Sequence, residues 1–266
     1  QVMHGRGYRK RSISNLIEEF KFIEKQLPEV KEVFLEDDSF TIDKTRVKNF
    51  CDAYRQAGLK ISWITNSRAD IDEATLQMMA SANCRLLCVG FESGEKKVLR
   101  GLRKNLDLKM ARSFVQQANR LKILIHGCFL FGGPGETLET MEKTLRYAKQ
   151  LNLDTAQFFP IMVYPGTEAF QWARENKFLT SDDYERWVTP EGLHNSLVSQ
   201  PGISHQQLVA FCDHSRREFY LRLNYLARRL LRFFLHPWED GPRLWRSFCV
   251  FWKFLLLKNH SGNGQS

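Results

Sequence analysis

One stretch of the sequence constrains the fold more than any other: residues 123–137, ILIHGCFLFGGPGET. Its apolar run, residues 123–131, lacks the alternation of a half-exposed strand, which is typical of a strand buried on both faces in a parallel sheet. The glycines that follow permit positive φ and close approach of a bound group, and Thr137 and Glu139 suit the cap and first turn of a helix. The stretch therefore predicts a strand, a turn and a helix N-terminus. A turn without a ligand explains it equally well when it is taken alone.

The remainder of the first two thirds of the chain continues this alternation. Apolar runs predict strands at residues 33–35, 61–65, 85–91, 123–131 and 155–163. Apolar stripes with helical spacing predict helices at residues 12–27, 47–57, 70–82, 109–121 and 138–151. A capping box with Asp70 as the cap and Glu73 as its partner is expected to start the third of these helices. Five strands alternating with helices indicate a parallel α/β barrel or an open parallel sheet.

Polar and glycine-rich segments follow the predicted strands, where ligands bind in parallel α/β folds. They are Glu36, Asp37, Asp38, Asn66, Arg68, Glu92, Ser93, Gly132, Gly133, Pro134, Gly135, Pro165, Gly166 and Thr167. Each of these residues, considered singly, is more readily a turn or a solvated loop than a ligand contact. Their recurrence at all five strand ends indicates a binding site along that edge of the sheet.

The net charge of +9 is concentrated in one part of the chain. Residues 216–258 contain ten Lys and Arg against three Asp and Glu, so the first 215 residues are nearly neutral. A nucleic-acid-binding fold would carry its charge over the whole surface, so nucleic acid is not an expected partner. Leucine, tryptophan and arginine along a helical tail suit an anionic membrane surface, and a helical hairpin packed on the barrel is the alternative.

The six cysteines and seven histidines show neither the spacing of a metal site nor that of a disulfide framework. No metal ligand is therefore assigned, and His126 is interpreted as a hydrogen-bonded core residue or a pocket wall. Scattered cysteines fit a reducing cytoplasm, and the first ten residues lack the apolar core of a signal peptide. The sequence predicts a cytoplasmic protein, with the inner face of the membrane as a further location if the basic tail binds lipid.

Five motifs follow one another along the chain. They begin at Glu36, Asn66, Gly90, Gly127 and Gln157, and the last one ends in Tyr164-Pro165-Gly166-Thr167. Taken together and in order, they resemble those of the radical S-adenosylmethionine (SAM) enzymes. The closest likeness is the branch with an upstream cobalamin-binding domain, which includes magnesium-protoporphyrin cyclases and hopanoid-modifying enzymes. The resemblance implies a partial barrel of five of six strands over residues 1–175. We expect a connector over 176–203 that contains a short helix around 182–187, a basic helical extension over 204–258 and a disordered tail over 259–266. Within the extension, a capping box at 204–207 is expected to open one long helix that Pro237 ends, and residues 244–257 form a second apolar segment.

The family's chemistry implies two cofactors and an electron donor. A [4Fe-4S] cluster held by three cysteines cleaves SAM reductively, and the 5′-deoxyadenosyl radical abstracts a hydrogen atom from a small substrate. For this branch the resemblance implies an apolar, lipid or ring-containing substrate, and it admits cobalamin as a further cofactor bound by an upstream domain.

The resemblance also assigns provisional roles at the strand ends, although no catalytic residue is assigned. Glu36, Asp37 and Asp38 would face the methionyl ammonium or the substrate. Arg68 and Lys104 would face the SAM carboxylate, and Glu92 and Ser93 the ribose. The turn formed by Gly132, Gly133, Pro134 and Gly135 would lie near the adenosine. For Arg68, an ion pair with Asp70 or Glu92 is an equally good interpretation.

The sequence departs from the family in its cysteines, because the C-x3-C-x2-C cluster motif is absent. Cys84 and Cys88 have the first half of that spacing, but Phe91 occupies the third position. Cys84 stands at the start of a predicted strand and Cys88 lies inside it. We therefore expect a piece of a longer protein that is cut just after its cluster loop. A catalytically silent remnant that binds nucleotide or a partner is the alternative. A sugar-phosphate barrel enzyme is a third hypothesis, for which the turn at Tyr164 supplies only one candidate phosphate site.

Overall fold

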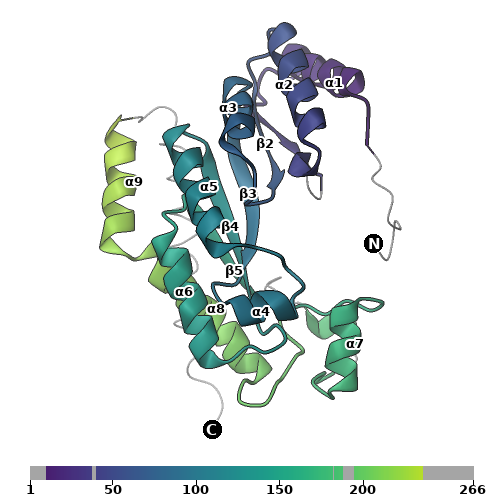
Figure 1. The fold of residues 1–266 in the computed structure, drawn as a ribbon, viewed down its shortest axis with the longest axis vertical. Helices are drawn as coiled ribbons and strands as arrows, with labels where there is room; N and C mark the ends of the chain where they lie inside the picture. Colours follow the sequence, from purple (N-terminus) through teal and green to yellow (C-terminus); the bar gives the residue numbers. More distant parts are fainter. Residues whose placement is uncertain (1–9, 38–39, 182, 188–194, 236–266) are drawn as a thin grey trace. The chain divides into compact units, whose positions relative to one another are not determined.

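The computed structural model describes residues 10–37, 40–181, 183–187 and 195–235. Five parallel strands form one sheet in the order in which they occur along the chain (Figure 1). They are β1 (Glu32–Leu35), β2 (Ser62–Ser67), β3 (Cys84–Glu92), β4 (Leu124–Phe131) and β5 (Thr155–Pro160). The predicted α/β fold, an incomplete parallel barrel with a helical extension, is confirmed.

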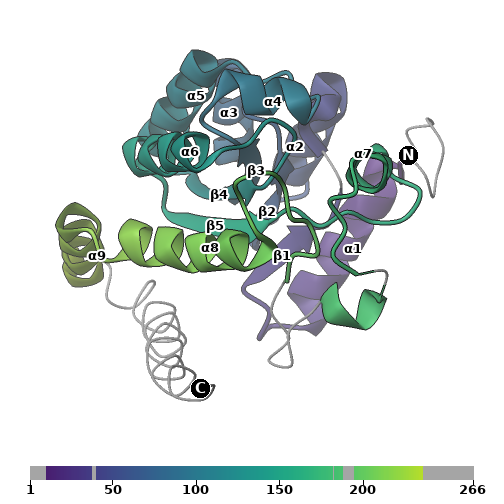
Figure 2. The same ribbon diagram turned by 90° about the horizontal axis from the view of Figure 1, so that it is seen from below.

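The sequential strand order determines where the helices lie. Because crossovers between parallel strands are right-handed, adding each strand at the same edge places the connecting helices on one face. Figure 2 shows this layer above the sheet. Its helices are α2 (Lys44–Gln56), α3 (Glu73–Ser81), α4 (Lys96–Gly101), α5 (Leu108–Arg120) and α6 (Leu138–Gln150). Helix α1 (Ile13–Gln26) precedes β1 and packs against α2 through Phe20 and Phe50, whose ring centroids are 5.7 Å apart.

The face of the sheet toward these helices carries the core. Phe91, Phe129 and Phe158 on β3, β4 and β5 are fully buried and stack in a row, with centroids 5.6 Å and 5.3 Å apart. On β2, Trp63 is fully buried and contacts Phe50 edge to face at 5.2 Å. Rings of this size account for a large share of the apolar area that folding removes from water.

The opposite face of the sheet is only half-buried. Alternate residues point to it because side chains on a strand alternate between the two faces. Its polar members are Asn66, Cys88, His126, Cys128, Thr155 and Gln157. Leu130 lies on the same face and packs against a small cluster of Ile161, Val163, Ala173 and Val198. This alternation differs from the expectation that the fourth strand is buried on both faces.

Side-chain caps start the helices, as expected for Ser, Thr and Asp at these positions. The Thr137 hydroxyl accepts a hydrogen bond from the Thr140 amide and caps α6, which confirms the predicted cap. Helix α3 is capped by Asp72, whose Oδ1 accepts from the Thr75 amide at 2.8 Å, so the prediction of Asp70 as the cap was wrong.

Three further segments differ from the prediction. The short helix α4 follows β3 where no helix was predicted, and the same holds for α7 (Glu168–Glu175), which Thr167 caps. The expected single long helix after Ser204 is instead two helices, α8 (His205–Tyr220) and α9 (Leu223–Leu235). Two 3-10 turns, η1 (Phe40–Ile42) and η2 (Tyr184–Trp187), complete the described elements, and η2 lies where a short helix was predicted.

Two compact units make up the chain, Gln1–Arg216 and Arg217–Ser266. The predicted boundaries at 175, 203 and 258 stay predictions, and the second apolar segment expected at 244–257 falls outside the described residues. Within the described part of the chain, no helix combines the length and hydropathy needed to cross a membrane.

Candidate functional site

The carboxyl ends of β1 to β5 lie at one edge of the sheet because the strands are parallel. The polar segments predicted at the strand ends therefore share this edge. Glu36 and Asp37 follow β1, Arg68 follows β2, Ser93 follows β3 and residues 132–135 follow β4. Asp38 lies outside the described residues.

An ion pair between Glu92 and Lys104 stands at the end of β3. Lys104 Nζ lies 3.2 Å from Glu92 Oε1, and both side chains remain partly exposed. Glu92 has a φ of 61°, in the left-handed region that non-glycine residues rarely adopt. A Cβ at Gly90 would collide with the Glu92 carboxylate and lie 3.3 Å from Lys104 Nζ. The glycine therefore leaves the space into which the Glu92 carboxylate folds.

Ser93 is fully buried, and its hydroxyl lies 2.9 Å from Thr144 Oγ1 on α6. The same threonine oxygen accepts from the Gly94 amide at 3.0 Å, and Ser93 Oγ accepts from the Glu95 amide at 3.1 Å. These bonds fasten the loop after β3 to α6. Ser93 thus has a clear structural role, and its predicted contact with a ribose stays a prediction.

Backbone conformation and packing both favour glycine in the turn after β4. Gly132 and Gly135 have φ values of 92° and 79°. A Cβ at Gly132 would lie 2.7 Å from a methyl group of Leu208, and one at Gly133 would lie 2.8 Å from a methyl group of Leu102. Gln200 Nε2 also donates to the Gly132 carbonyl at 2.6 Å. The predicted proximity of this turn to an adenosine is not tested by these contacts.

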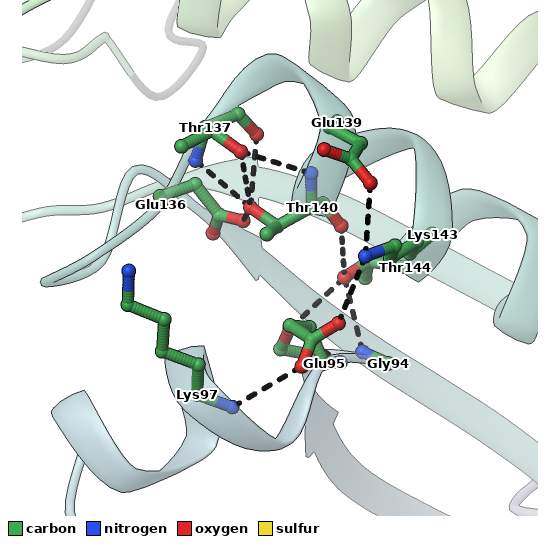
Figure 3. A network of polar contacts seen from close by, with 10 residues as sticks. Gly94, Glu95, Lys97, Glu136, Thr137, Glu139, Thr140, Lys143 and Thr144 are labelled. Carbon is green, nitrogen blue, oxygen red and sulfur yellow. Dashed lines mark hydrogen bonds and ion pairs between the residues drawn. The ribbon is translucent and has the colours of Figure 1, made fainter.

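Glu136, next in the turn, is 5% exposed. Burial raises its pKa to about 7, although hydrogen bonds from the Thr140 hydroxyl and the Gly132 amide partly oppose the rise. Its second oxygen, Oε2, has no hydrogen-bond partner. Figure 3 shows Glu136 beside Thr137 and Thr140 at the start of α6. Glu136 was not among the predicted site residues, although a carboxyl directly before a capping threonine in an apolar turn was an available signal.

A second polar connection joins the loop after β3 to α6 on the exposed side (Figure 3). Lys143 Nζ lies 3.0 Å from Glu139 and 3.5 Å from Glu95. The Lys97 amide donates to Glu95 at 3.4 Å, and the Lys97 side chain extends past Gly135. Together with Ser93 and Thr144, this network holds the ends of β3 and β4 in a fixed relation.

The residues after β1 and β2 form their own contacts. Arg68 pairs with Asp70, with Nη2 and Oδ2 2.5 Å apart, and this hydrogen bond lowers the pKa of Asp70. The ion pair with Asp70, one of the two alternatives considered for Arg68, is thus present, while Glu92 pairs with Lys104. Asn66 Nδ2 donates to the Asp37 carbonyl at 2.9 Å, which joins the two loops. Glu36 is exposed.

The half-buried face of the sheet adds a row of neutral polar groups that the predicted site did not include. His126 Nδ1 lies 2.8 Å from Thr155 Oγ1, and burial lowers the pKa of the imidazole. Cys128 is two residues further along β4, and burial raises the pKa of its thiol to about 12. Cys88 pairs in register with His126, and Gln157 pairs with Cys128. A neutral imidazole, two thiols and an amide can bind uncharged polar groups.

The family model of the Radical SAM superfamily matches residues 3–148. The chain belongs to the radical SAM superfamily.

Individual relatives agree with this assignment. An uncharacterized methyltransferase of Pyrococcus horikoshii is 28% identical over 85% of this chain and 49% of its own length. The anaerobic magnesium-protoporphyrin IX monomethyl ester cyclase of Rubrivivax gelatinosus is 26% identical over 70% of this chain and 34% of its own length. The radical SAM chain thus spans about half or less of the length of these relatives.

A solved structure supports the fold. The radical SAM methyltransferase TsrM of Kitasatospora setae, solved with cobalamin and a [4Fe-4S] cluster bound, superposes with a TM-score of 0.64 at 17% identity. The superposition covers 77% of this chain and 47% of TsrM. At this level of identity, the likeness concerns the barrel.

The described residues of this radical SAM chain do not fit a [4Fe-4S] cluster. Such a cluster is held by three or four cysteine thiolates that lie close together. The described residues contain no group of three or more His, Cys, Asp or Glu side chains that could hold a metal ion. Cys84 is buried within β3, and burial raises the pKa of its thiol, which disfavours the thiolate. Cys88, four residues on, is half-buried in the same strand.

Proposed function

We propose that this chain forms the SAM-binding barrel of a radical SAM methyltransferase. The observation that carries the proposal is the Glu92–Lys104 pair at the edge of the sheet, in a chain of this superfamily. A SAM molecule presents a carboxylate, an ammonium and two ribose hydroxyls. Lys104 would bind the carboxylate, and Glu92 would bind the ribose hydroxyls. The binding of SAM would thus replace the ion pair with two charge-assisted contacts.

Several features support this assignment. The two side chains are 41% and 22% exposed, so a ligand reaches them without opening the core. The polar row of His126, Cys128 and Gln157 continues from this pair across the half-buried face. The methyltransferase part of the proposal takes its support from the name of the Pyrococcus relative and from TsrM.

We further propose that the substrate is a small molecule with an apolar portion. Half-buried apolar side chains lie on the same face of the sheet as the polar row. They are Ile64, Leu86, Leu124, Leu130 and Phe159. A face that mixes methyl groups with a neutral imidazole and an amide suits a molecule with hydrocarbon and uncharged hydrogen-bonding groups.

The proposed cofactors keep the roles that the family implies. Bound SAM supplies a methyl group, or a 5′-deoxyadenosyl radical that abstracts a hydrogen atom when an electron donor and a cluster are present. Cobalamin would be held by a separate domain. Since the described residues do not fit a cluster, this chain's own part is to bind and orient SAM and substrate.

A silent remnant that at most binds nucleotide or a partner is the second candidate function. The observation that favours it is that the described residues do not bring three thiolates together. Iron and sulfide analysis after anaerobic reconstitution of the 266-residue chain tests the thiolate geometry. We expect less than one iron per chain, and four irons with four sulfides would contradict the geometry described above.

Titration calorimetry with SAM tests the main proposal. Lys104→Met and Glu92→Gln are each expected to weaken SAM binding by about tenfold or more, because each removes a charge-assisted hydrogen bond. Lys143→Met is the matched control, since Lys143 has the same 41% side-chain exposure and pairs with acids at the adjoining loop. No heat of binding with the unmodified chain, or equal weakening by Lys143→Met, would overturn the proposal and favour the remnant.

A further inference from the structure

Helix α9 exposes a continuous apolar stripe. Its residues recur at three- and four-residue spacing, which places them on one side of a helix. The stripe consists of Leu223, Leu226, Leu230 and Leu231, which are between 41% and 83% exposed. Single exposed leucines are common on protein surfaces, but a contiguous stripe of four leucines marks an interaction surface.

The other side of α9 packs against its own unit. Tyr225 is 8% exposed, and its ring lies 5.6 Å from Phe219 and 5.3 Å from Tyr220. Arg229 Nε donates to the Tyr225 hydroxyl at 3.0 Å. The apolar stripe is therefore directed away from the aromatic residues that anchor the helix.

Positive charge accompanies the stripe. Residues 216–235 contain six arginines and one acidic residue, Glu218, and α9 itself contains no acidic residue. Arg228 is exposed, and it is positioned with Arg229 outside the stripe on the helical wheel. An apolar stripe flanked by arginines matches a surface that offers hydrocarbon beneath negative charge, as acidic phospholipids do.

We propose that α9 docks in the plane of an anionic membrane surface, with the stripe inserted among the acyl chains and Arg228 and Arg229 near the lipid headgroups. Thirteen residues of helix extend about 20 Å, which suits a helix lying in the interface and is too short to cross the hydrocarbon core. The docking brings the radical SAM chain to a lipid surface and is independent of SAM binding.

Vesicle sedimentation tests the docking with the full chain. We expect binding to vesicles of phosphatidylcholine and phosphatidylglycerol to exceed binding to phosphatidylcholine alone by more than about tenfold, because each basic residue near an acidic surface contributes about fivefold. This preference should decrease as the salt concentration rises.

Two variants separate the apolar and the charged contributions. Leu230→Gln with Leu231→Gln should weaken binding to acidic vesicles by about tenfold or more. The control is Phe22→Gln with Met110→Gln, which removes two side chains of matching exposure, 60% and 57% against 56% and 61%, and should bind as the unmodified chain does. Arg228→Gln should reduce only the preference for acidic lipid.

Three outcomes would overturn the proposal. One is equal binding to acidic and neutral vesicles, and another is equal loss in the control double variant. The third is a lipid-free dimer in analytical ultracentrifugation that the Leu230 and Leu231 substitutions convert to monomer, because a second copy would then cover the stripe. Arg228→Gln keeps the test decisive if the leucine variant does not fold.

Discussion

The two faces of the sheet differ in what they contribute. The face toward the helices holds fully buried rings at Phe91, Phe129 and Phe158, which stack across three strands. The opposite face presents His126, Cys128 and other half-buried polar groups. Residues that alternate along the same strands therefore belong to two different environments. The fully buried rings that stabilise the fold lie on one face, and the half-buried polar groups of the proposed binding site lie on the other.

The largest expected effect comes from a cavity in the ring stack. Phe129→Ala should lower the free energy of unfolding by about 3–5 kcal/mol, because it removes a fully buried ring from between Phe91 and Phe158. Urea denaturation measures this loss. Gln157→Ala, which replaces an exposed residue of the half-buried face, should change stability by less than about 0.5 kcal/mol. Equal losses in the two variants would contradict the division between the faces.

The second-largest effect on stability is expected from the buried carboxyl group of Glu136, near the start of α6. Because the pKa of Glu136 rises from 4.5 to about 7 on folding, the unfolded chain releases this proton first as the pH increases. The contribution of Glu136 to the free energy of unfolding should therefore fall by roughly 3 kcal/mol between pH 4.5 and pH 7.

Glu136→Gln removes this pH dependence. Compared with the unmodified chain, the variant should gain stability progressively from pH 4.5 to pH 8 in urea denaturation. Glu139→Gln is the control, because Glu139 lies on the same helix with a largely exposed side chain. A difference between Glu136→Gln and the unmodified chain that is constant with pH would show that the carboxyl is not ionising in this range.

Two glycines at the end of β3 should have a smaller effect on stability. One lies against α6, and the other lies beside the Glu92–Lys104 pair. A Cβ at Gly94 would lie 3.0 Å from the Thr144 Cα and 3.1 Å from the Lys143 carbonyl, which are backbone atoms of α6. Gly94→Ala should therefore cost about 1–3 kcal/mol. At Gly90 a Cβ would meet only the flexible ends of Glu92 and Lys104.

Gly90→Ala should accordingly keep most of the stability and displace the ion pair. Thermal unfolding measures the first quantity and SAM titration the second. We expect the Gly90 variant to lose affinity at nearly unchanged Tm, and the Gly94 variant to lose Tm. A large drop in Tm for Gly90→Ala would mean that this edge is as tightly packed as the helix side.

The smallest effect is expected at His126. Burial lowers its pKa, so the unfolded chain binds a proton more readily than the folded chain, and stability should decrease as the pH falls below about 6.5. His126→Gln should reduce this decrease in urea denaturation at pH 5 relative to pH 8. The change should be smaller than that at Glu136, because His126 is only half-buried.

The sequence predicted the architecture because strand and helix periodicities are local and regular. The strand order and the edge that gathers the loops follow from five short apolar runs that alternate with amphipathic helices. The turn at Gly132 and the cap at Thr137 were predicted because their residue types carry a strong conformational preference.

Other features depend on tertiary contacts that periodicity does not encode. Helix α4 has only six residues, too few for a helical stripe to be recognised. Leu221 and Arg222 separate α8 from α9, although neither is a proline or a glycine, the residues that commonly mark the end of a helix. The burial of Glu136 and the choice of Asp70 as the partner of Arg68 arise from the packing of neighbouring loops.

Because side chains alternate between the two faces of β4, residues on one face can be replaced with little effect on the packing of the other. His126 and Cys128 alternate with Gly127 and Phe129, so an exchange at 126 or 128 leaves the aromatic stack in place. In the proposed site, replacements at these two positions would alter the contacts to the substrate with little effect on folding. An engineer wishing to redirect this scaffold would begin with those alternate positions.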